Sequence, residues 1–470
     1  MTEGRVLKFE QPANFYYNNA LKYIESGDYI NALPQLRKAR EMEPENQEYT
    51  LALAQALTEI GRFDDSNSLL FSLMDSEYFS GECYFGIGCN FMGLNDYERA
   101  QQSFERYLDK EPDGDFAEEI GDFLEFIYDM EDEEDVYLED VKLKHGFEMA
   151  AEGKKYLDMG DYKKAAEIFS GIDLERKELL FAKNNLALAY YCLKNTSGAI
   201  RTALEVLEKD KENIHAWCNL ALFYTEVGDY YNATKAIGKI LELNTDNTDE
   251  LYKIAITLCD LNQHEYALKY LEKILERRTC DVKSMYFAAI ACFNLGKYQK
   301  AADYISDILK IEPDNILAKY YSGYMKEVLH SQRSPEKLDY RMTLPDGENE
   351  KRRAYMQQIL ENTSDEFIDF LWESDDYFKE MVCWALEYAS YSMRKQICVK
   401  LSRTKKKSVE MFFRDYILKA RNSEGVKNMM LIYLKKMGAP EPYVANMGGS
   451  VVEVRVGLTK NDDKKDETEE

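Results

Sequence analysis

Small and large residues recur along positions 146–315 with a period of 34 residues, which divides this stretch into five copies. The copies start at Gly146, Leu180, Ile214, Thr248 and Val282. The eighth position of each copy is small, and a second small residue follows twelve positions later. These two columns are Gly153, Ala187, Ala221, Ala255 and Ala289, then Ala165, Ala199, Ala233, Ala267 and Ala301. Small residues at a fixed phase let two antiparallel helices approach closely and stack on the next pair, so the pattern predicts a helical solenoid.

Bulky apolar residues on the same helix faces support this prediction. One column in the second predicted helix reads Ile172, Val206, Ile240, Ile274 and Ile308. The turn between the helices reads Gly160-Asp161-Tyr162 and Gly228-Asp229-Tyr230 in two copies, whereas Lys194-Asn195-Thr196 and Asn262-Gln263-His264 depart from it. The period and the Gly-Asp-Tyr turn resemble the tetratricopeptide repeat family. The resemblance implies an all-α fold, an α-solenoid in which helix-turn-helix repeats form a right-handed superhelix.

The same pattern precedes the main array. Residues 13–114 hold three further copies, with Gly27-Asp28-Tyr29 in the first and Asp96-Tyr97 in the third, so we expect an N-terminal array of three repeats. We expect residues 146–332 to form the main array of five repeats, with a capping helix over 316–331. Ser334-Pro335 and Leu344-Pro345 mark a polar linker at 333–350.

Residues 115–145 lose the repeat pattern and contain five consecutive acids at 131–135. One interpretation is a degenerate repeat inside one continuous superhelix. The other is a capping helix followed by an acidic hinge between two arrays. We favour the second, because consecutive acids repel one another and pack poorly as a second helix. The acidic run is either a solvated linker or a dock for a basic partner.

Residues 351–437 return to helical spacing without the 34-residue phase. Two helix pairs are predicted, Tyr377–Leu386 with Met393–Leu401 and Val409–Leu418 with Val426–Leu434. Their period near 30 residues loosely resembles α-solenoid repeats of the HEAT type. Residues 438–470 are expected to be a mostly disordered tail, in which the valines of 451–456 form one short strand or none.

A basic segment lies between these two helix pairs. Its seven bases are Arg394, Lys395, Lys400, Arg403, Lys405, Lys406 and Lys407, with no acid between the first and the last. This segment is either a solvated turn between helices or a binding surface. As a surface it would bind the chain's own acidic segments, an acidic partner or nucleic acid. It lacks the interleaved aromatic residues on which bases stack.

The chain has 60 Lys and Arg against 86 Asp and Glu, a net charge of −26. Such a field repels phosphate backbones, so we do not expect a nucleic-acid partner. Nine Cys occur without a Cys-x-x-Cys pair, so reduced packing residues are expected rather than a metal site, and no cofactor is predicted. The first residues lack the pattern of a signal peptide and no run of about 18 apolar residues occurs. We therefore expect a cytoplasmic protein that does not contact membranes.

Function is expected on the concave face, which the first helices of a curved repeat array line. The fifth and sixth positions of the repeats and nearby tyrosines supply the candidate peptide-binding residues. They are Asn184, Asn185, Tyr191, Asn219, Tyr252, Lys253 and Tyr286. Asn185 and Asn219 offer donors and acceptors to successive peptide groups, and Lys253 offers a charge to an acidic side chain or a C-terminal carboxylate. The tyrosines offer apolar area with a polar tip.

Three function classes remain. A scaffold or adaptor that binds a protein or an extended peptide, with no catalytic residues, is the favoured one. A peptide-responsive regulator whose C-terminal helical region is the output is the alternative. An enzyme is disfavoured, because none of the four His stands in a nucleophile motif and no phosphate-binding loop occurs. The residue pattern of a clamp for acidic chaperone tails is also incomplete, since Asp249 stands where a base is needed.

Overall fold

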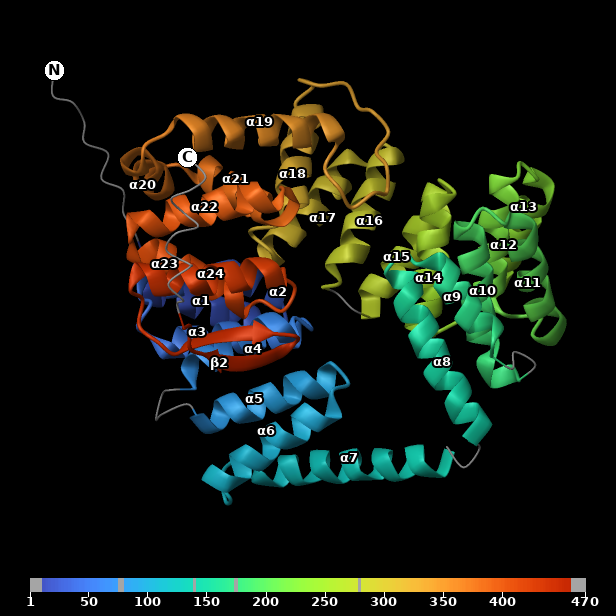
Figure 1. Ribbon diagram of the computed structural model, residues 1–470, viewed down its shortest axis with the longest axis horizontal. Helices are drawn as coiled ribbons and strands as arrows, with labels where there is room; N and C mark the ends of the chain where they lie inside the picture. Colours follow the sequence, from blue (N-terminus) through green and yellow to red (C-terminus); the bar gives the residue numbers. More distant parts are fainter. Residues whose placement is uncertain (1–10, 75–79, 138–140, 173–175, 278–279, 458–470) are drawn as a thin grey trace. The chain divides into compact units, whose positions relative to one another are not determined.

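The computed structural model describes residues 11–74, 80–137, 141–172, 176–277 and 280–457. These residues are almost entirely helical, and the chain divides into two compact units (Figure 1). We call Glu125–Ile308 with Ser322–Arg341 the central unit, and Met1–Leu124 with Leu309–Tyr321 and Met342–Glu470 the terminal unit. No described helix is both long and apolar enough to cross a membrane.

Paired antiparallel helices build the central unit. The first helices of its repeats are α8 (Val141–Asp158), α10 (Leu180–Cys192), α12 (Ile214–Glu226), α14 (Thr248–Asp260) and α16 (Val282–Asn294). The second helices are α9 (Tyr162–Ser170), α11 (Thr196–Lys209), α13 (Tyr230–Glu242), α15 (His264–Arg277) and α17 (Tyr298–Ile311), and α18 (Ile316–Leu329) follows. A single 3-10 turn, η1 (Lys177–Leu179), precedes α10. From α10 to α16 each first helix begins at the residue that starts a 34-residue copy, as expected of a repeat solenoid.

The turn between the two helices of a repeat has the same conformation whatever its sequence. Its first residue has a positive φ in all five repeats, at Gly160, Lys194, Gly228, Asn262 and Gly296. In three repeats the side chain of the residue after it, Asp161, Asn195 or Asp229, accepts a hydrogen bond from the next helix. Asp229 Oδ1, for example, accepts from the Asn232 N–H at 3.1 Å. Such a cap satisfies one of the N–H groups that a helix start leaves unpaired. Sequences that depart from Gly-Asp-Tyr therefore still make this turn.

The small columns lie where neighbouring helices touch. Ala187, Ala221, Ala255 and Ala289 are fully buried, and so are Ala199, Ala267 and Ala301 in the second helices. At Gly153 an added Cβ would stand 2.8 Å from the ring of Phe169. The close approach of the helices thus requires small residues at these positions.

The terminal unit begins with three more helix pairs. These are α1 (Ala13–Glu25) with α2 (Tyr29–Met42), α3 (Gln47–Glu59) with α4 (Phe63–Leu73), and α5 (Ser80–Gly93) with α6 (Tyr97–Lys110). The long helix α7 (Ala117–Tyr137) follows; its residues from Glu125 on, including the five acids at 131–135, are counted with the central unit. The side chains of that run lie outside the described residues, as do residues 1–10.

The C-terminal helices of this unit are stacked in successive layers. They are α19 (Asp346–Asn362), α20 (Asp365–Ser374), α21 (Asp376–Tyr388), α22 (Tyr391–Thr404), α23 (Lys407–Leu418) and α24 (Glu424–Met437). Helix α19 packs beside α21, α20 beside α22, and α22 beside α24. This arrangement is that of a second kind of helical repeat, and α21 to α24 correspond to the two predicted helix pairs.

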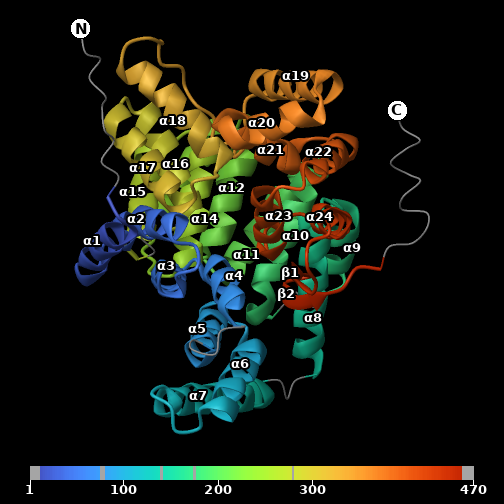
Figure 2. The ribbon, with the colours of Figure 1, turned by 90° about the vertical axis from the view of Figure 1, so that its left-hand side faces the viewer.

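A β-hairpin follows where we expected a mostly disordered tail. Strands β1 (Tyr443–Met447) and β2 (Ser450–Val454) pair antiparallel, with Met447 opposite Ser450. Gly448 and Gly449, both at positive φ, make the two-residue turn that such a hairpin needs. Tyr443 and Ala445 are fully buried, and β1 packs on α23 and α24 (Figure 2). The buried Lys427 ammonium donates to the Asn446 carbonyl at 2.7 Å. The charged end of the tail, residues 458–470, lies outside the described residues.

Candidate functional site

The seven candidate residues lie on four consecutive first helices, α10, α12, α14 and α16. Asn184, Asn219 and Tyr286 are buried, with 5%, 2% and 2% of their surface exposed. Asn185, Tyr191, Tyr252 and Lys253 are partly exposed. We call the side of these four helices that carries the seven residues the first-helix face.

Three of the candidates form one hydrogen-bonded run across three repeats. The Lys253 ammonium donates to Asn219 Oδ1 at 3.0 Å, and Asn219 Nδ2 donates to the Asn184 carbonyl oxygen at 3.2 Å. The Asn184 side chain donates to Asn213 Oδ1 at 3.0 Å, and Asn213 also caps α12. The asparagines therefore join α10, α12 and α14 and hold Lys253 in place.

Lys253 is a cation in a poorly solvated position. Burial lowers its pKa from the ordinary value. Burial also lowers the pKa of His215, and the charge of Lys253 lowers it further. Within the described parts of the chain Lys253 has no carboxylate in ion-pair distance. An anionic group brought to this point would recover electrostatic energy that burial has cost.

The three candidate tyrosines have different surroundings. Tyr191 stacks on Phe223 with ring centroids 4.9 Å apart. The Lys283 ammonium lies 5.4 Å from the ring centre of Tyr252, whose hydroxyl is buried without a hydrogen-bond partner among the described residues. The Tyr286 hydroxyl donates to the carbonyl oxygen of Arg341 at 3.1 Å. Tyr286 thus contacts a segment of the chain that follows α18.

That segment, residues 333–341, contains no helix or strand and lies against the first helices of the last repeats. We call it the docked segment; in Figure 1 it belongs to the connection that leaves α18 and passes beside α16. The Asn294 side chain binds two main-chain groups of the docked segment, both at Leu338. Asn294 Nδ2 donates to the Leu338 carbonyl oxygen, and the Leu338 N–H donates to Asn294 Oδ1, each at 2.8 Å. One side chain on this face therefore recognises an extended peptide backbone.

Tyr340 is the principal side-chain contact of the docked segment. Its hydroxyl is 2.8 Å from His264 Nδ1, and its ring lies 5.7 Å from the ring of His264 and 6.1 Å from that of Phe287. Burial, followed by the thiol of Cys259, raises the pKa of Tyr340 far above its ordinary value. Burial, and then the charge of Lys337, lowers the pKa of His264. The tyrosine is thus held in its neutral form beside a neutral imidazole.

The N-terminal part of the docked segment is held by Tyr324 of α18. The Glu336 N–H donates to the Tyr324 hydroxyl at 3.1 Å, and the Arg333 guanidinium lies 4.4 Å from the ring centre. Arg333 also approaches Glu327 at 3.7 Å. The segment is therefore bound at both ends and in its middle.

Sequence reasoning did not identify this part of the face. The pattern marked His264 only as a departure from the Gly-Asp-Tyr turn, and Asn294, the last residue of α16, belongs to no repeat column. An asparagine at that place carries no signal by itself, because its partner, Leu338, is 44 residues away along the chain.

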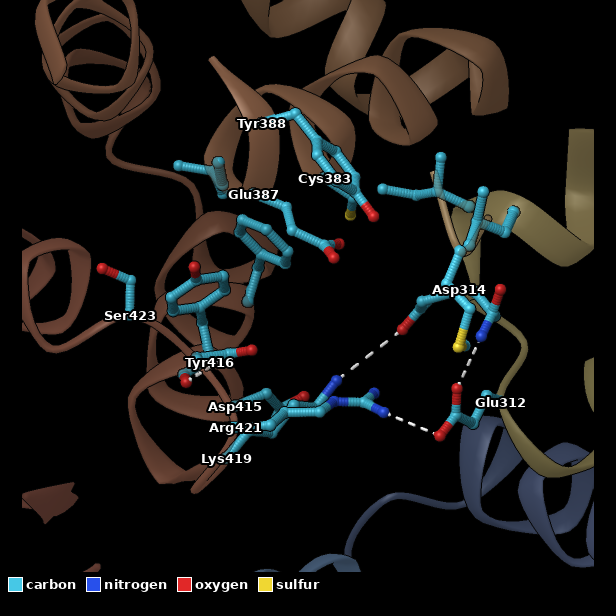
Figure 3. A pocket seen from close by; sticks show the side chains of 17 residues that line it. Glu312, Asp314, Cys383, Glu387, Tyr388, Asp415, Tyr416, Lys419, Arg421 and Ser423 are labelled. Carbon is cyan, nitrogen blue, oxygen red and sulfur yellow. Dashed lines mark hydrogen bonds and ion pairs between the residues drawn. The ribbon is translucent and has the colours of Figure 1, made fainter. Parts of the chain in front are cut away.

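The terminal unit contains a cavity of about 590 Å³ between the start of α18, α21 and α23 (Figure 3). Two ion pairs lie at its wall, Arg421 with Glu312 at 2.8 Å and Lys419 with Asp314 at 3.7 Å. Glu387 and Asp415 also line the cavity, and burial raises the pKa of Asp415. Burial raises the pKa of the Cys383 thiol to about 12. A thiol of that pKa is protonated near neutrality and is a poor nucleophile.

Glu312 also connects this cavity to the N-terminal repeats of the same unit. It forms a second ion pair with Arg62 of the loop before α4, at 2.6 Å. Arg37 of α2 donates to the carbonyl oxygen of Ile311 at 2.7 Å, and the Ser68 hydroxyl donates to that of Leu418 at 3.2 Å. These contacts give the charges at the cavity a structural role.

The basic segment meets acids of its own unit. Lys406 pairs with Asp369 at 3.2 Å and Arg403 with Asp365 at 3.7 Å, both on α20. Lys400 donates to the Thr363 carbonyl oxygen at 2.7 Å. The basic segment therefore contacts acidic residues of its own chain, which is one of the alternatives considered for it. In the described parts of the chain no cluster of His, Cys, Asp and Glu is arranged to hold a metal ion.

Three family models match the chain. Two, described as "Tetratricopeptide repeat", match residues 23–78 and 82–114. The third, described as "Anaphase-promoting complex, cyclosome, subunit 3", matches residues 226–308. A curated relative, the TPR repeat-containing protein YvcD of Bacillus subtilis (strain 168), is 31% identical over 217 residues. The match covers 45% of this chain and 44% of YvcD, so it spans less than half of that relative.

Solved structures of repeat proteins are also similar. One is YrrB, described as "a TPR protein with an unusual peptide-binding site", which is 22% identical with a TM-score of 0.29 over 36% of this chain and 87% of that one. Another is a tetratricopeptide repeat protein from Parabacteroides merdae ATCC 43184, 16% identical with a TM-score of 0.31 over 62% and 99% of the two chains. The matched family models and YvcD, together with the 34-residue helix pairs of both units, show that the chain contains tetratricopeptide repeats.

Proposed function

We propose that this repeat scaffold binds an extended peptide of a protein partner on the first-helix face, without catalysing a reaction. The observation that carries the proposal is the pair of hydrogen bonds between Asn294 and the main chain at Leu338. A side chain that binds both the N–H and the carbonyl of one residue suits an extended chain of any sequence. The face already accommodates such a chain at one end.

The candidate residues have distinct roles in this proposal. Asn184 and Asn219 position Lys253 through the hydrogen-bonded run. An ammonium has three donors, and one of those of Lys253 is used on Asn219. The others, in a site short of carboxylates, favour an acidic side chain or a C-terminal carboxylate of the peptide. Asn185, which is partly exposed, makes polar contacts with the peptide in this proposal.

The tyrosines complete the proposed site. Tyr191 and Tyr252 are partly exposed and supply apolar area beside Lys253. Tyr286 already donates to a peptide carbonyl, that of Arg341. The site thus combines main-chain recognition, one charge and aromatic surface.

Three thiols on the helices of this face, those of Cys218, Cys259 and Cys292, are buried in the core and are not nucleophiles. Burial raises the pKa of Cys218 and of Cys292 to about 11 each. Burial raises that of Cys259 even further. Each thiol is therefore protonated near neutrality, and none is an activated nucleophile.

Site-specific photo-crosslinking tests the proposal. The photoreactive residue p-benzoylphenylalanine would replace Tyr191 on the first-helix face and, as a matched control, Tyr231 of α13, a second-helix tyrosine that is 80% exposed. We expect partner peptides to be crosslinked in cells at position 191 and not at 231. Lys253→Met should lower the yield at 191, and Lys239→Met, which changes an exposed lysine of α13, should not. Equal yields at 191 and 231, or yields at 231 alone, would refute the proposed site.

A further inference from the structure

The docked segment has the contacts of a bound ligand, although it belongs to the same chain. It contains no helix or strand, its main chain is held by the side chain of Asn294, and exposed and partly buried side chains alternate from Lys337 to Arg341. Leu338 and Tyr340 are partly buried, whereas Lys337, Asp339 and Arg341 are exposed. Side chains alternate in this way when an extended strand contacts a protein surface along one of its two faces.

The site specifies the residue at position 340 more narrowly than that at 338. The hydroxyl of Tyr340 lies at hydrogen-bond distance from His264 Nδ1, and phenylalanine would leave that nitrogen without this partner. The ring also lies against that of Phe287, with an interplanar angle of 57°. At 338 the requirement is a partly buried apolar side chain. The recognised pattern is therefore a large aliphatic residue, any residue, and a tyrosine.

The docked segment buries little apolar surface, although hydrogen bonds hold it at both ends and in its middle. All its side chains except those of Leu338 and Tyr340 are exposed, and none of its residues lies in a helix or strand. Segments with few buried apolar contacts open more readily than the elements on which they lie. A segment of this kind can be exchanged without unfolding the repeats beneath it.

We propose that residues 338–340 occupy a site for extended segments of the form aliphatic-x-tyrosine, and that a partner protein with such a segment displaces them. The inference rests on the proposed function, because it assumes that the first-helix face binds peptides, and it adds the sequence class of the ligand. The chain's own segment competes for the site and keeps it closed until the partner arrives.

The test uses the full chain and a fluorescein-labelled peptide with the sequence of residues 333–341. In the vacated variant, Leu338→Ser and Tyr340→Ser remove both buried side chains. The matched control, Lys337→Ser with Asp339→Ser, changes the exposed neighbours in the same segment. We expect the vacated variant to bind the peptide at least tenfold more tightly than the wild type or the control. Adding Asn294→Ala to the vacated variant should weaken binding at least tenfold.

Two results would overturn the inference. One is equal binding of the labelled peptide by the vacated variant and the wild type. The other is unchanged affinity for a peptide with serine at the leucine and tyrosine positions. If the vacated variant does not fold, hydrogen exchange of the wild-type Leu338 amide is measured with excess unlabelled peptide, and unchanged exchange also overturns it. If any of these results is obtained while partner proteins still crosslink at position 191, the proposed function is retained. Only the assignment of residues 338–340 as a bound ligand is then refuted.

Discussion

Replacing Asn294 by alanine should release the docked segment locally while the repeats stay folded. The change removes two hydrogen bonds of 2.8 Å, one to the N–H and one to the carbonyl of Leu338. Leu338 is partly exposed, so both groups are rehydrated on release and each bond contributes only about 1 kcal/mol net. A total of roughly 2 kcal/mol corresponds to roughly a thirtyfold shift toward the released state.

Hydrogen exchange of the Glu336 amide measures this release, because that amide donates to the Tyr324 hydroxyl and not to Asn294. We expect its exchange to accelerate roughly thirtyfold in Asn294→Ala, with little change at amides within α16. Gln299→Ala, which alters an exposed residue of α17, is the control and should leave Glu336 exchange unaffected. Asn294→Asp keeps the acceptor but loses the donor, so it should give an intermediate effect. Unchanged Glu336 exchange in a folded Asn294→Ala protein would show that Asn294 does not hold the segment.

Three further predictions concern single residues. Lys194→Gly should raise the free energy of unfolding by about 0.5–1 kcal/mol in chemical denaturation, because Lys194 has a φ of 63° that costs an L-residue but not glycine; an unchanged midpoint would contradict this. Ala221→Leu should lower it by about 1–3 kcal/mol, because Ala221 is fully buried between helices, and unchanged thermal stability would argue against the repeat packing. Docking of the segment should weaken as the pH falls below about 6.5. Burial and the charge of Lys337 lower the pKa of His264 in the docked state, so the released state binds a proton more readily. Hydrogen exchange at Leu338, corrected for its intrinsic pH dependence, should show this weakening in the wild type but not in His264→Gln.

The repeat framework was predictable because its signals recur at a fixed period. Helices α10, α12, α14 and α16 begin at the predicted copy starts, since each start is fixed by a cap and an apolar stripe that lie within one repeat. The turn conformation was harder to predict where glycine is missing. Lys194 and Asn262 take the same left-handed conformation as Gly160 because the two flanking helices impose it.

The repeat phase predicted on which helices the candidate residues lie, but not the hydrogen bonds that they make. Repeat phase places Asn219 and Lys253 on consecutive first helices, but their hydrogen bond to each other depends on how closely α12 approaches α14. The docked segment could not be predicted from the pattern, because irregular chain has no periodicity. Its contacts with Asn294 and His264 join residues 44 and 76 positions apart. The hairpin was missed for a similar reason: the burial of Tyr443 is decided by α23 and α24.

The covalent attachment of the docked segment sets a threshold for competing ligands. A ligand on a short tether has an effective concentration on the order of millimolar at its own site. A free peptide of equal intrinsic affinity has to reach a similar concentration to occupy half of the molecules. A partner already bound elsewhere on this chain gains the same tethering advantage, so avidity rather than the affinity of one short motif decides which proteins open the site. By occupying the site, Tyr340 and its neighbours therefore favour partners that bind the scaffold at two places.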